Sequence, residues 1–237
     1  DFAGCDVVVL CVSMDADVMQ QATALAAVLP PGSTVVDHST VSVGTARQAQ
    51  ALLAARGIGL LDAPVSGGVE DAAALEKVRP VLEAYAARIT HMGGTGSGQA
   101  TKAVNQVLVA GINEAVCEGL ALGEKLGLDP EKLLPTLMAG AAANWFLDKR
   151  GATMLAGKFA PGFKCGHLLK DLTIVQAMAD EVGLHSSVIG MARAHYDELV
   201  QRGEADADTS ALIMLKRVQP LADRLISTRG VKHGRLV

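Results

Sequence analysis

The chain has 237 residues, of which 50% are hydrophobic and 19% are charged. This length and apolar content allow a core of ordinary density, favour two domains, and exclude an intrinsically disordered chain. The formal net charge is −4, and the sequence contains no block of Lys or Arg. The composition therefore argues against a nucleic-acid partner and favours chemistry on small molecules.

Neither a membrane span nor a metal site is predicted. Charged, glycine or proline residues interrupt every apolar run before it reaches about 18 residues. The four cysteines, Cys5, Cys11, Cys117 and Cys165, include no C-x-x-C pair, and the histidines show no metal-ligand spacing. We therefore expect reduced, buried thiols in a cytoplasmic protein.

The first hundred residues alternate expected strands and helices. Residues 7–12 form an unbroken apolar run, which is typical of a strand buried on both faces. Because this run comes so soon after Asp1, which is not an initiator methionine, we expect upstream residues to be missing from the sequence. Further strands are expected at 34–37, 58–61 and 88–91, and helices at 15–29, 45–56 and 71–85. This order predicts an α/β doubly wound parallel sheet, an incomplete Rossmann-type domain over residues 1–97.

A glycine-rich hinge at residues 93–98 ends the alternation, and everything after it has a helical pattern. The first helix, at 99–126, is unusually long; Gly127 stops it, and Pro130 begins the next helix. Further helices are expected at 131–139, 145–156, 168–182, 186–202 and 210–221. Residues 98–237 are therefore predicted to form an all-α domain for substrate binding and dimerisation.

Lys102 is the first candidate for chemistry. It lies in the first turn of the long helix, and no other charge follows before Glu114. Asn105 and Gln106 project from the same side of the helix, whose other faces are apolar. Burying an ammonium group is costly unless it is paired or loses its proton. From the residues alone, Lys102 is either held for a function or is a lysine that reaches solvent at a helix start.

A second candidate is the loop that follows the expected strand at 58–61. Ser66, Gly67 and Gly68 would lie at the carboxyl edge of the sheet, where open α/β folds bind ligands. The serine hydroxyl and the uncovered backbone N–H groups could hold a carboxylate. The alternative is an ordinary loop, for which the same tripeptide is common.

Two other strand ends point to the same edge of the sheet. Val12 and Ser13 follow the first expected strand, and Thr40 follows the second. These residues are candidate ligand contacts, although Ser and Thr also serve as helix caps. His38, at the second strand end, is an alternative catalytic base.

Three segments, in this order, resemble the 3-hydroxyisobutyrate dehydrogenase (β-hydroxyacid dehydrogenase) family. Residues 62–69 (DAPVSGGV) resemble its substrate-binding segment. Residues 96–106 (GSGQATKAVNQ) resemble its catalytic segment, and residues 159–172 resemble its F-x-P-G-F…K-D-L stretch. The resemblance extends over nearly the entire chain.

The resemblance implies an NAD(P)-dependent oxidoreductase acting on a small β-hydroxy acid or its semialdehyde, of the 3-hydroxyisobutyrate or tartronate semialdehyde type. It implies that Lys102 is the general acid/base and that the Ser66 loop holds the substrate carboxylate. Asn105 and Gln106 would orient the substrate, and Gln106, where the family often has Asn, is similar to tartronate semialdehyde reductases. The contacts implied for the NAD or NADP cofactor are Val12, Ser13, Thr40, Phe163 and Lys170.

The chain departs from the family pattern in two places. The amino-terminal βαβ unit with its G-x-G-x-x-G fingerprint, roughly sixty residues, is absent. A further turn and strand of about fifteen residues is absent after Val69. We expect that residues were left out of the sequence at both places. The alternative is a non-catalytic helical dimerisation module with a truncated nucleotide domain. A second enzymatic alternative is an imine reductase or a 6-phosphogluconate-type dehydrogenase with the same architecture, and Lys102 argues against the imine reductase. In either case we expect a homodimer or higher homo-oligomer.

Overall fold

The computed structural model describes residues 2–65, 69–70 and 72–217. These residues form two compact units. The first lies within Asp1–Val109 and Lys170–Gly190, and the second within Ala110–Leu169 and Met191–Val237. The domain boundary at residues 97 and 98 stays a prediction, and the compact units divide the chain elsewhere because three helices contribute to both.

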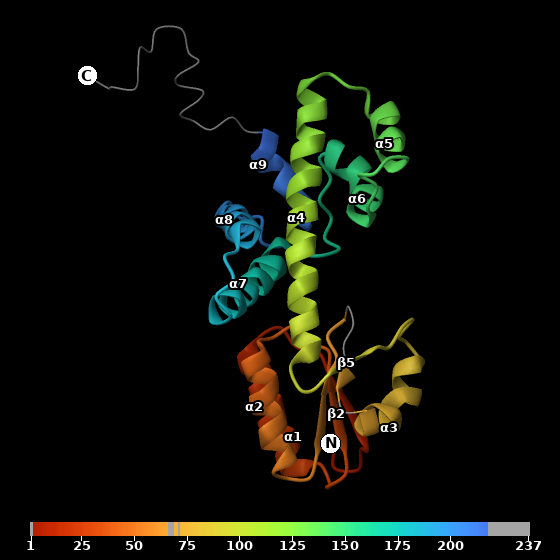
Figure 1. The fold of residues 1–237 in the computed structure, drawn as a ribbon, viewed down its shortest axis with the longest axis vertical. Helices are drawn as coiled ribbons and strands as arrows, with labels where there is room; N and C mark the ends of the chain where they lie inside the picture. Colours follow the sequence, from red (N-terminus) through yellow and green to blue (C-terminus); the bar gives the residue numbers. More distant parts are fainter. Residues whose placement is uncertain (1, 66–68, 71, 218–237) are drawn as a thin grey trace, which may run out of the picture. The chain divides into compact units, whose positions relative to one another are not determined.

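The first unit is built on a parallel sheet of three strands in the order β1 (Val7–Leu10), β2 (Thr34–Asp37) and β3 (Gly59–Asp62). Helices α1 (Asp15–Val28) and α2 (Val43–Ala54) lie on one side of the sheet, and α3 (Ala72–Glu83) lies on the other (Figure 1). The strand side chains alternate between these two sides. Val35 belongs to the apolar cluster that contains residues of α1 and α2, whereas Val36 belongs to the cluster that contains residues of α3. The predicted α/β class is confirmed.

The first unit contains a short strand that the sequence analysis did not predict. β4 (Val69–Glu70) pairs in parallel with β5 (His91–Gly93), and the two strands form a separate small sheet. Two residues carry no recognisable alternation, so sequence patterns could not reveal β4. The strand predicted at 88–91 is observed at residues 91–93, as β5.

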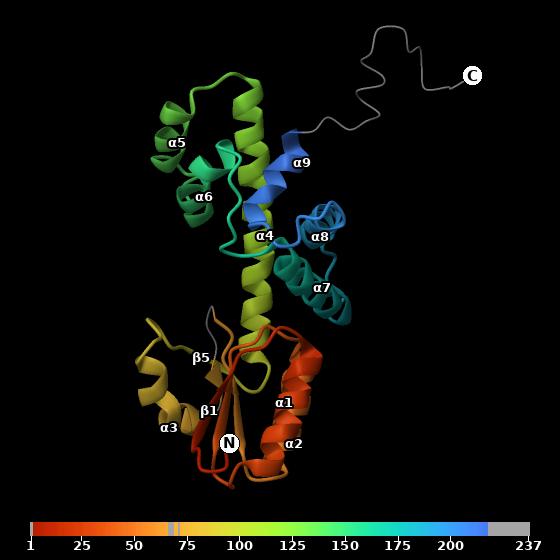
Figure 2. The same ribbon diagram turned by 180° about the vertical axis from the view of Figure 1, so that it is seen from behind.

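The second unit is helical, as predicted for this part of the chain. The long helix α4 (Ser97–Lys125) and α7 (Cys165–Glu181) extend into it, and α8 (Ser187–Gln201) lies mostly within it. Figures 1 and 2 both show α5 and α6 on one side of α4 and α8 on the other. The predicted helix at 210–221 begins as a 3₁₀ turn, and its residues after 217 lie outside those described. The remaining elements are α5 (Pro130–Met138), α6 (Trp145–Leu155), the 3₁₀ helix η1 (Thr209–Leu212) and α9 (Ile213–Arg217).

Two polar side chains buried in the second unit, those of Asn113 and Tyr196, are hydrogen-bonded to each other. The Asn113 amide donates to the Tyr196 hydroxyl at 2.9 Å, and this hydroxyl donates to the Thr209 carbonyl at 3.0 Å. Because Tyr196 is fully buried, these bonds offset the cost of removing its hydroxyl from water. No helix in the described part of the chain is long and apolar enough to span a membrane.

Candidate active site

The start of α4 is held against the end of β3 by Asp62. Its carboxylate accepts a hydrogen bond from the Gln99 backbone N–H at 3.0 Å and a longer one from the Gly96 N–H at 3.4 Å. A carboxylate at a helix start satisfies N–H groups that lack partners within the helix, and it favours the positive end of the helix dipole. Sequence reasoning missed this role of Asp62, although an acidic residue is a common helix cap.

Both glycines of the G-S-G sequence are required by this arrangement. Gly96 has a φ of +99°, a conformation that side chains other than glycine rarely adopt. A Cβ atom on Gly98 would lie 2.3 Å from the carbonyl oxygen of Asp62. The glycines therefore let α4 begin in direct contact with the end of β3, one turn before Lys102.

Lys102 is half-buried, and its Nζ atom donates to the Val65 carbonyl oxygen at 3.1 Å. Burial lowers the pKa of the Lys102 amine below its ordinary value of 10.5. The Asp171 carboxylate opposes this effect on the pKa, and the Lys170 ammonium adds to it. The structure thus holds an amine with a lowered pKa beside the loop after β3.

The two polar residues that follow Lys102 on α4 are joined to Asp171. The Asn105 amide donates to the Gln106 Oε1 atom at 3.0 Å, and the Gln106 amide donates to the Asp171 Oδ2 atom at 2.7 Å. Gln106 is buried, whereas Asn105 is partly exposed. Substrate contact by either residue stays a prediction, and these bonds favour Asn105 for direct contact and Gln106 for a supporting role.

Lys170 connects α7 to the ends of two strands. Its Nζ atom donates to the carbonyl oxygens of Ser13 at 3.1 Å and Thr40 at 2.7 Å, and it lies 3.0 Å from the Asp171 Oδ1 atom. The Val12 backbone N–H donates to the Ser39 hydroxyl nearby in the same loops. The structure therefore brings together Ser13, Thr40 and Lys170, which the sequence analysis had placed at the cofactor.

The structure does not test the roles of four other predicted site residues. Ser66, Gly67 and Gly68 lie outside the described residues. Phe163 belongs to the second unit, where its backbone N–H donates to the Asp208 carboxylate at 3.2 Å. The roles of these four residues stay predictions.

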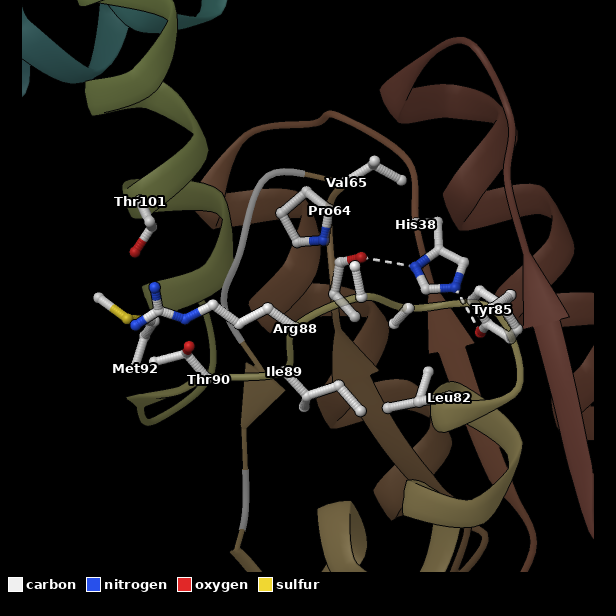
Figure 3. Close-up of a pocket in the computed structure, with 13 residues that line it drawn as sticks. His38, Pro64, Val65, Leu82, Tyr85, Arg88, Ile89, Thr90, Met92 and Thr101 are labelled. Carbon is white, nitrogen blue, oxygen red and sulfur yellow. Dashed lines mark hydrogen bonds between the residues drawn. The ribbon is translucent and has the colours of Figure 1, made fainter.

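His38 is poorly suited to be the alternative base. Its Nδ1 atom lies 2.5 Å from the Ala63 carbonyl oxygen, and its Nε2 atom lies 2.8 Å from the Tyr85 hydroxyl (Figure 3). A carbonyl can only accept, so Nδ1 carries the proton and Nε2 accepts from Tyr85. Both ring nitrogens are therefore occupied, and Lys102 is the better candidate. Within the described ranges, no group of three or more His, Cys, Asp or Glu side chains is arranged to hold a metal ion.

Two models of known protein families match this chain. Residues 2–94 match the family model described as the NAD binding domain of 6-phosphogluconate dehydrogenase. Residues 96–216 match the one described as NAD-binding of NADP-dependent 3-hydroxyisobutyrate dehydrogenase. Together the two matches extend over both compact units.

Individual relatives are similar over most of the chain. An uncharacterized oxidoreductase of Shewanella frigidimarina is 33% identical, over 89% of this chain and 78% of that protein. The 2-hydroxy-3-oxopropionate reductase of Escherichia coli is 33% identical, over 77% of this chain and 67% of that protein. A structure of Mycobacterium tuberculosis 3-hydroxyisobutyrate dehydrogenase with L-serine is 30% identical and superimposes with a TM-score of 0.81, over 91% of this chain and 81% of that one.

The fold is a parallel sheet flanked by helices and followed by a helical unit. Together with these matches, it defines an oxidoreductase with a Rossmann-like NAD(P)-binding domain. The chain belongs to the β-hydroxyacid dehydrogenase family, which includes 3-hydroxyisobutyrate dehydrogenase and 2-hydroxy-3-oxopropionate reductase. Its activity class is that of an NAD(P)-dependent hydroxyacid dehydrogenase.

The described residues fit NAD or NADP at the carboxyl edge of the sheet. Ser13 is exposed and Thr40 is partly exposed, and they follow the adjacent parallel strands β1 and β2. Cofactor contact by Val12, Ser13, Thr40 and Lys170 stays a prediction, and the Lys170 ammonium already contacts the Ser13 and Thr40 carbonyl oxygens and the Asp171 carboxylate. When bound, the nicotinamide supplies the hydride acceptor or donor.

Proposed function

We propose that this chain interconverts a small β-hydroxy acid, of the 3-hydroxyisobutyrate or tartronate semialdehyde type, and its semialdehyde, with Lys102 as the general acid/base. The observation that carries the proposal is the half-buried Lys102 amine, which has a lowered pKa and lies at the carboxyl edge of the sheet. A general base works best when its pKa is close to the operating pH. Partial removal of water therefore prepares this amine to exchange protons.

The residues around Lys102 support a simple proton transfer. In the oxidative direction, the neutral Nζ atom accepts the proton of the substrate hydroxyl; in the reductive direction, the ammonium returns it. Asp171 stabilises the charged form through its carboxylate and prevents the pKa from falling further. Gln106 holds Asp171 and Asn105 in place, and Asn105 is proposed to orient the substrate.

The substrate carboxylate is proposed to bind at Ser66, Gly67 and Gly68, directly after Val65. Val65 supports this placement, because its carbonyl oxygen accepts a hydrogen bond from Lys102. Phe163 is proposed to contact the cofactor. Names of relatives favour this substrate class, since they include 2-hydroxy-3-oxopropionate reductase and 3-hydroxyisobutyrate dehydrogenase.

The Lys102→Ala variant tests the catalytic assignment. Loss of general acid/base catalysis is expected to lower kcat by about 10² to 10⁴-fold, while the Kd for NAD or NADP stays close to that of the unchanged protein. Turnover is measured at 340 nm, and cofactor binding by calorimetry. Lys125→Ala, an exposed lysine on the same helix, is the matched control and should leave kcat unchanged. A normal kcat for Lys102→Ala contradicts the proposal.

We also propose a cytoplasmic homodimer or higher homo-oligomer with no nucleic-acid partner. Exposed apolar side chains on α4 support self-association, among them Leu108 and Leu122, which are 61% and 57% exposed. The four cysteines carry free thiols, which is typical of a reducing compartment. The expectation that all four are buried is wrong, because Cys11 is exposed and Cys5 is half-buried. Light scattering after size-exclusion chromatography tests the oligomer, and a monomer at micromolar concentration contradicts it.

A further inference from the structure

A cavity of about 570 Å³ lies in the first unit beside the carboxyl ends of β2 and β3 (Figure 3). This volume is within the range of small-molecule sites, roughly 300–1,000 Å³. Its wall includes residues after these strands, the end of α3, the segment that leads to β5, and one residue of α4. Among them are His38, Pro64, Leu82, Tyr85, Ile89 and Thr101.

The end of the cavity formed by His38 and Tyr85 is suited to an apolar group. The two side chains are hydrogen-bonded to each other, and the second ring nitrogen of His38 is bonded to the Ala63 carbonyl oxygen. Neither ring nitrogen is left for a polar ligand, and the neighbouring wall is formed by Leu82 and Ile89. Burying an apolar group here therefore removes apolar surface from water and displaces no polar bond.

The cavity borders the proposed acid/base. Val65 lines it, and the Val65 carbonyl oxygen accepts the hydrogen bond from the Lys102 Nζ atom. Thr101, which precedes Lys102 on α4, also lines the cavity. A molecule that reacts at Lys102 can therefore extend a substituent into this space.

The opposite end of the cavity carries a positive charge. Figure 3 shows the Arg88 side chain with its guanidinium group directed toward Thr101 and away from Tyr85. Arginine is a preferred partner of carboxylates because its fork of N–H donors matches their geometry. A ligand with one anionic end and one apolar end would thus orient with its anionic end near Thr101.

We propose that this cavity receives an apolar substituent on the α carbon of the substrate. The preferred substrates are then β-hydroxy acids with a branched or aromatic substituent, rather than those with a single methyl group. The inference rests on the proposed function, since it assigns a substrate class to the same site. The substituent lies against Tyr85, Leu82 and Ile89. The carboxylate, at the Thr101 end, is shared between Arg88 and the loop that begins after Val65, where the proposed function places it.

The first test is a comparison of kcat/KM for 3-hydroxypropanoates that carry methyl, isobutyl or benzyl at carbon 2. Each buried methylene is expected to raise kcat/KM about fourfold, so the benzyl acid should exceed the methyl acid by on the order of tenfold or more. The Ala87→Phe variant places a ring in the cavity wall and should lower kcat/KM for the benzyl acid by about tenfold, with little effect on the methyl acid. Ala84→Phe is the matched control, because Ala84 is an exposed alanine of the same segment. A wild-type preference for the methyl acid overturns the proposal.

The second test requires no turnover. Calorimetry compares 2-benzylpropanoate with 2-methylpropanoate, neither of which has a hydroxyl group to oxidise. Tighter binding of the benzyl compound, weakened by Ala87→Phe and not by Ala84→Phe, supports the cavity assignment. Equal affinity for the two acids, or a benzyl affinity that Ala87→Phe leaves unchanged, overturns it. If the benzyl compound binds in this way and no hydroxy acid is oxidised, the reaction in the proposed function fails and the apolar specificity of the cavity stands. Thermal unfolding followed by circular dichroism checks that both variants are folded.

Discussion

Replacing Gly98 with alanine tests the contact that sets the position of Lys102. The new Cβ atom would lie 2.3 Å from the Asp62 carbonyl oxygen, which is a backbone atom that no rotamer change can move. Restoring an ordinary contact requires a displacement of roughly 1 Å between β3 and the start of α4. The variant therefore strains the joint between the two elements that hold the proposed site.

The expected effect has two parts. Overpacking costs about 1–3 kcal/mol, and alanine regains about 1 kcal/mol of helix propensity, so the free energy of unfolding should fall by up to about 2 kcal/mol. For a chain of this length, where 1 kcal/mol shifts the Tm by about 2–4 °C, the Tm should fall by at most about 8 °C. A displacement of 1 Å at a reacting group can reduce the rate by about 100-fold, so kcat/KM should fall far more than stability implies.

Gly119→Ala is the matched control for this experiment. Gly119 lies on the same helix, and nothing within 4 Å would meet its Cβ atom. This variant should gain about 0.5–1 kcal/mol in stability and leave kcat/KM unchanged. Differential scanning calorimetry and steady-state kinetics at 340 nm measure both effects. If Gly98→Ala melts at or above the wild-type temperature with an unchanged kcat/KM, the contact between Asp62 and α4 does not set the position of Lys102.

Three further predictions follow from individual contacts. The Asp171 carboxylate raises the pKa of Lys102, so Asp171→Asn should lower that pKa. In the oxidative direction kcat increases as Lys102 loses its proton, and this increase should occur at lower pH in the variant. A pH profile that is unchanged or shifted to higher pH contradicts the prediction. Although burial opposes them, hydrogen bonds hold the pKa of Asp208 below 3.8, so its stabilising effect is present above about pH 4 and is lost as the pH falls through the folded-state pKa. Asp208→Ala should therefore lower the free energy of unfolding by about 3 kcal/mol at pH 7, because it leaves Arg150 without its partner at 3.1 Å. The loss should become smaller toward pH 3, and urea titrations at each pH measure it. A loss that does not change with pH argues against this role of Asp208. Tyr196→Phe leaves two buried polar groups without partners and should cost about 1–3 kcal/mol in urea unfolding, whereas a loss below about 0.5 kcal/mol would mean that water replaces the hydroxyl.

Much of the fold follows from local patterns. The apolar run at residues 7–12 predicts a buried strand, and the helical pattern of the second half predicts helices, because the apolar side chains of each element must be buried. β2 has the predicted bounds, and α4 and α6 begin or end within two residues of the predictions. β4 could not be predicted, since a strand of two residues is formed by its pairing with β5 and not by its own composition.

The candidate site shows the same division between local pattern and long-range contact. The motif around Lys102 and the glycines before it predicted a catalytic segment from the sequence. The role of Asp62 could not be read there, because it depends on the backbone of a segment 37 residues later. Trp145 is a comparable case: its type alone suggests core, and the structure leaves it 67% exposed.

The sequence by itself determined the class of fold, the family and the lysine that is proposed to act as acid/base, because periodicity and short motifs depend on neighbouring residues. Only the tertiary structure decided what surrounds that lysine. Gln106 meets Asp171 across 65 residues, and Lys170 meets Ser13 across 157. Packing of this kind buries Lys102, which lowers the pKa of its amine, and places the charges of Asp171 and Lys170 close enough to modify that pKa. These contacts arise from the packing of whole helices against the sheet, which no local stretch of sequence specifies.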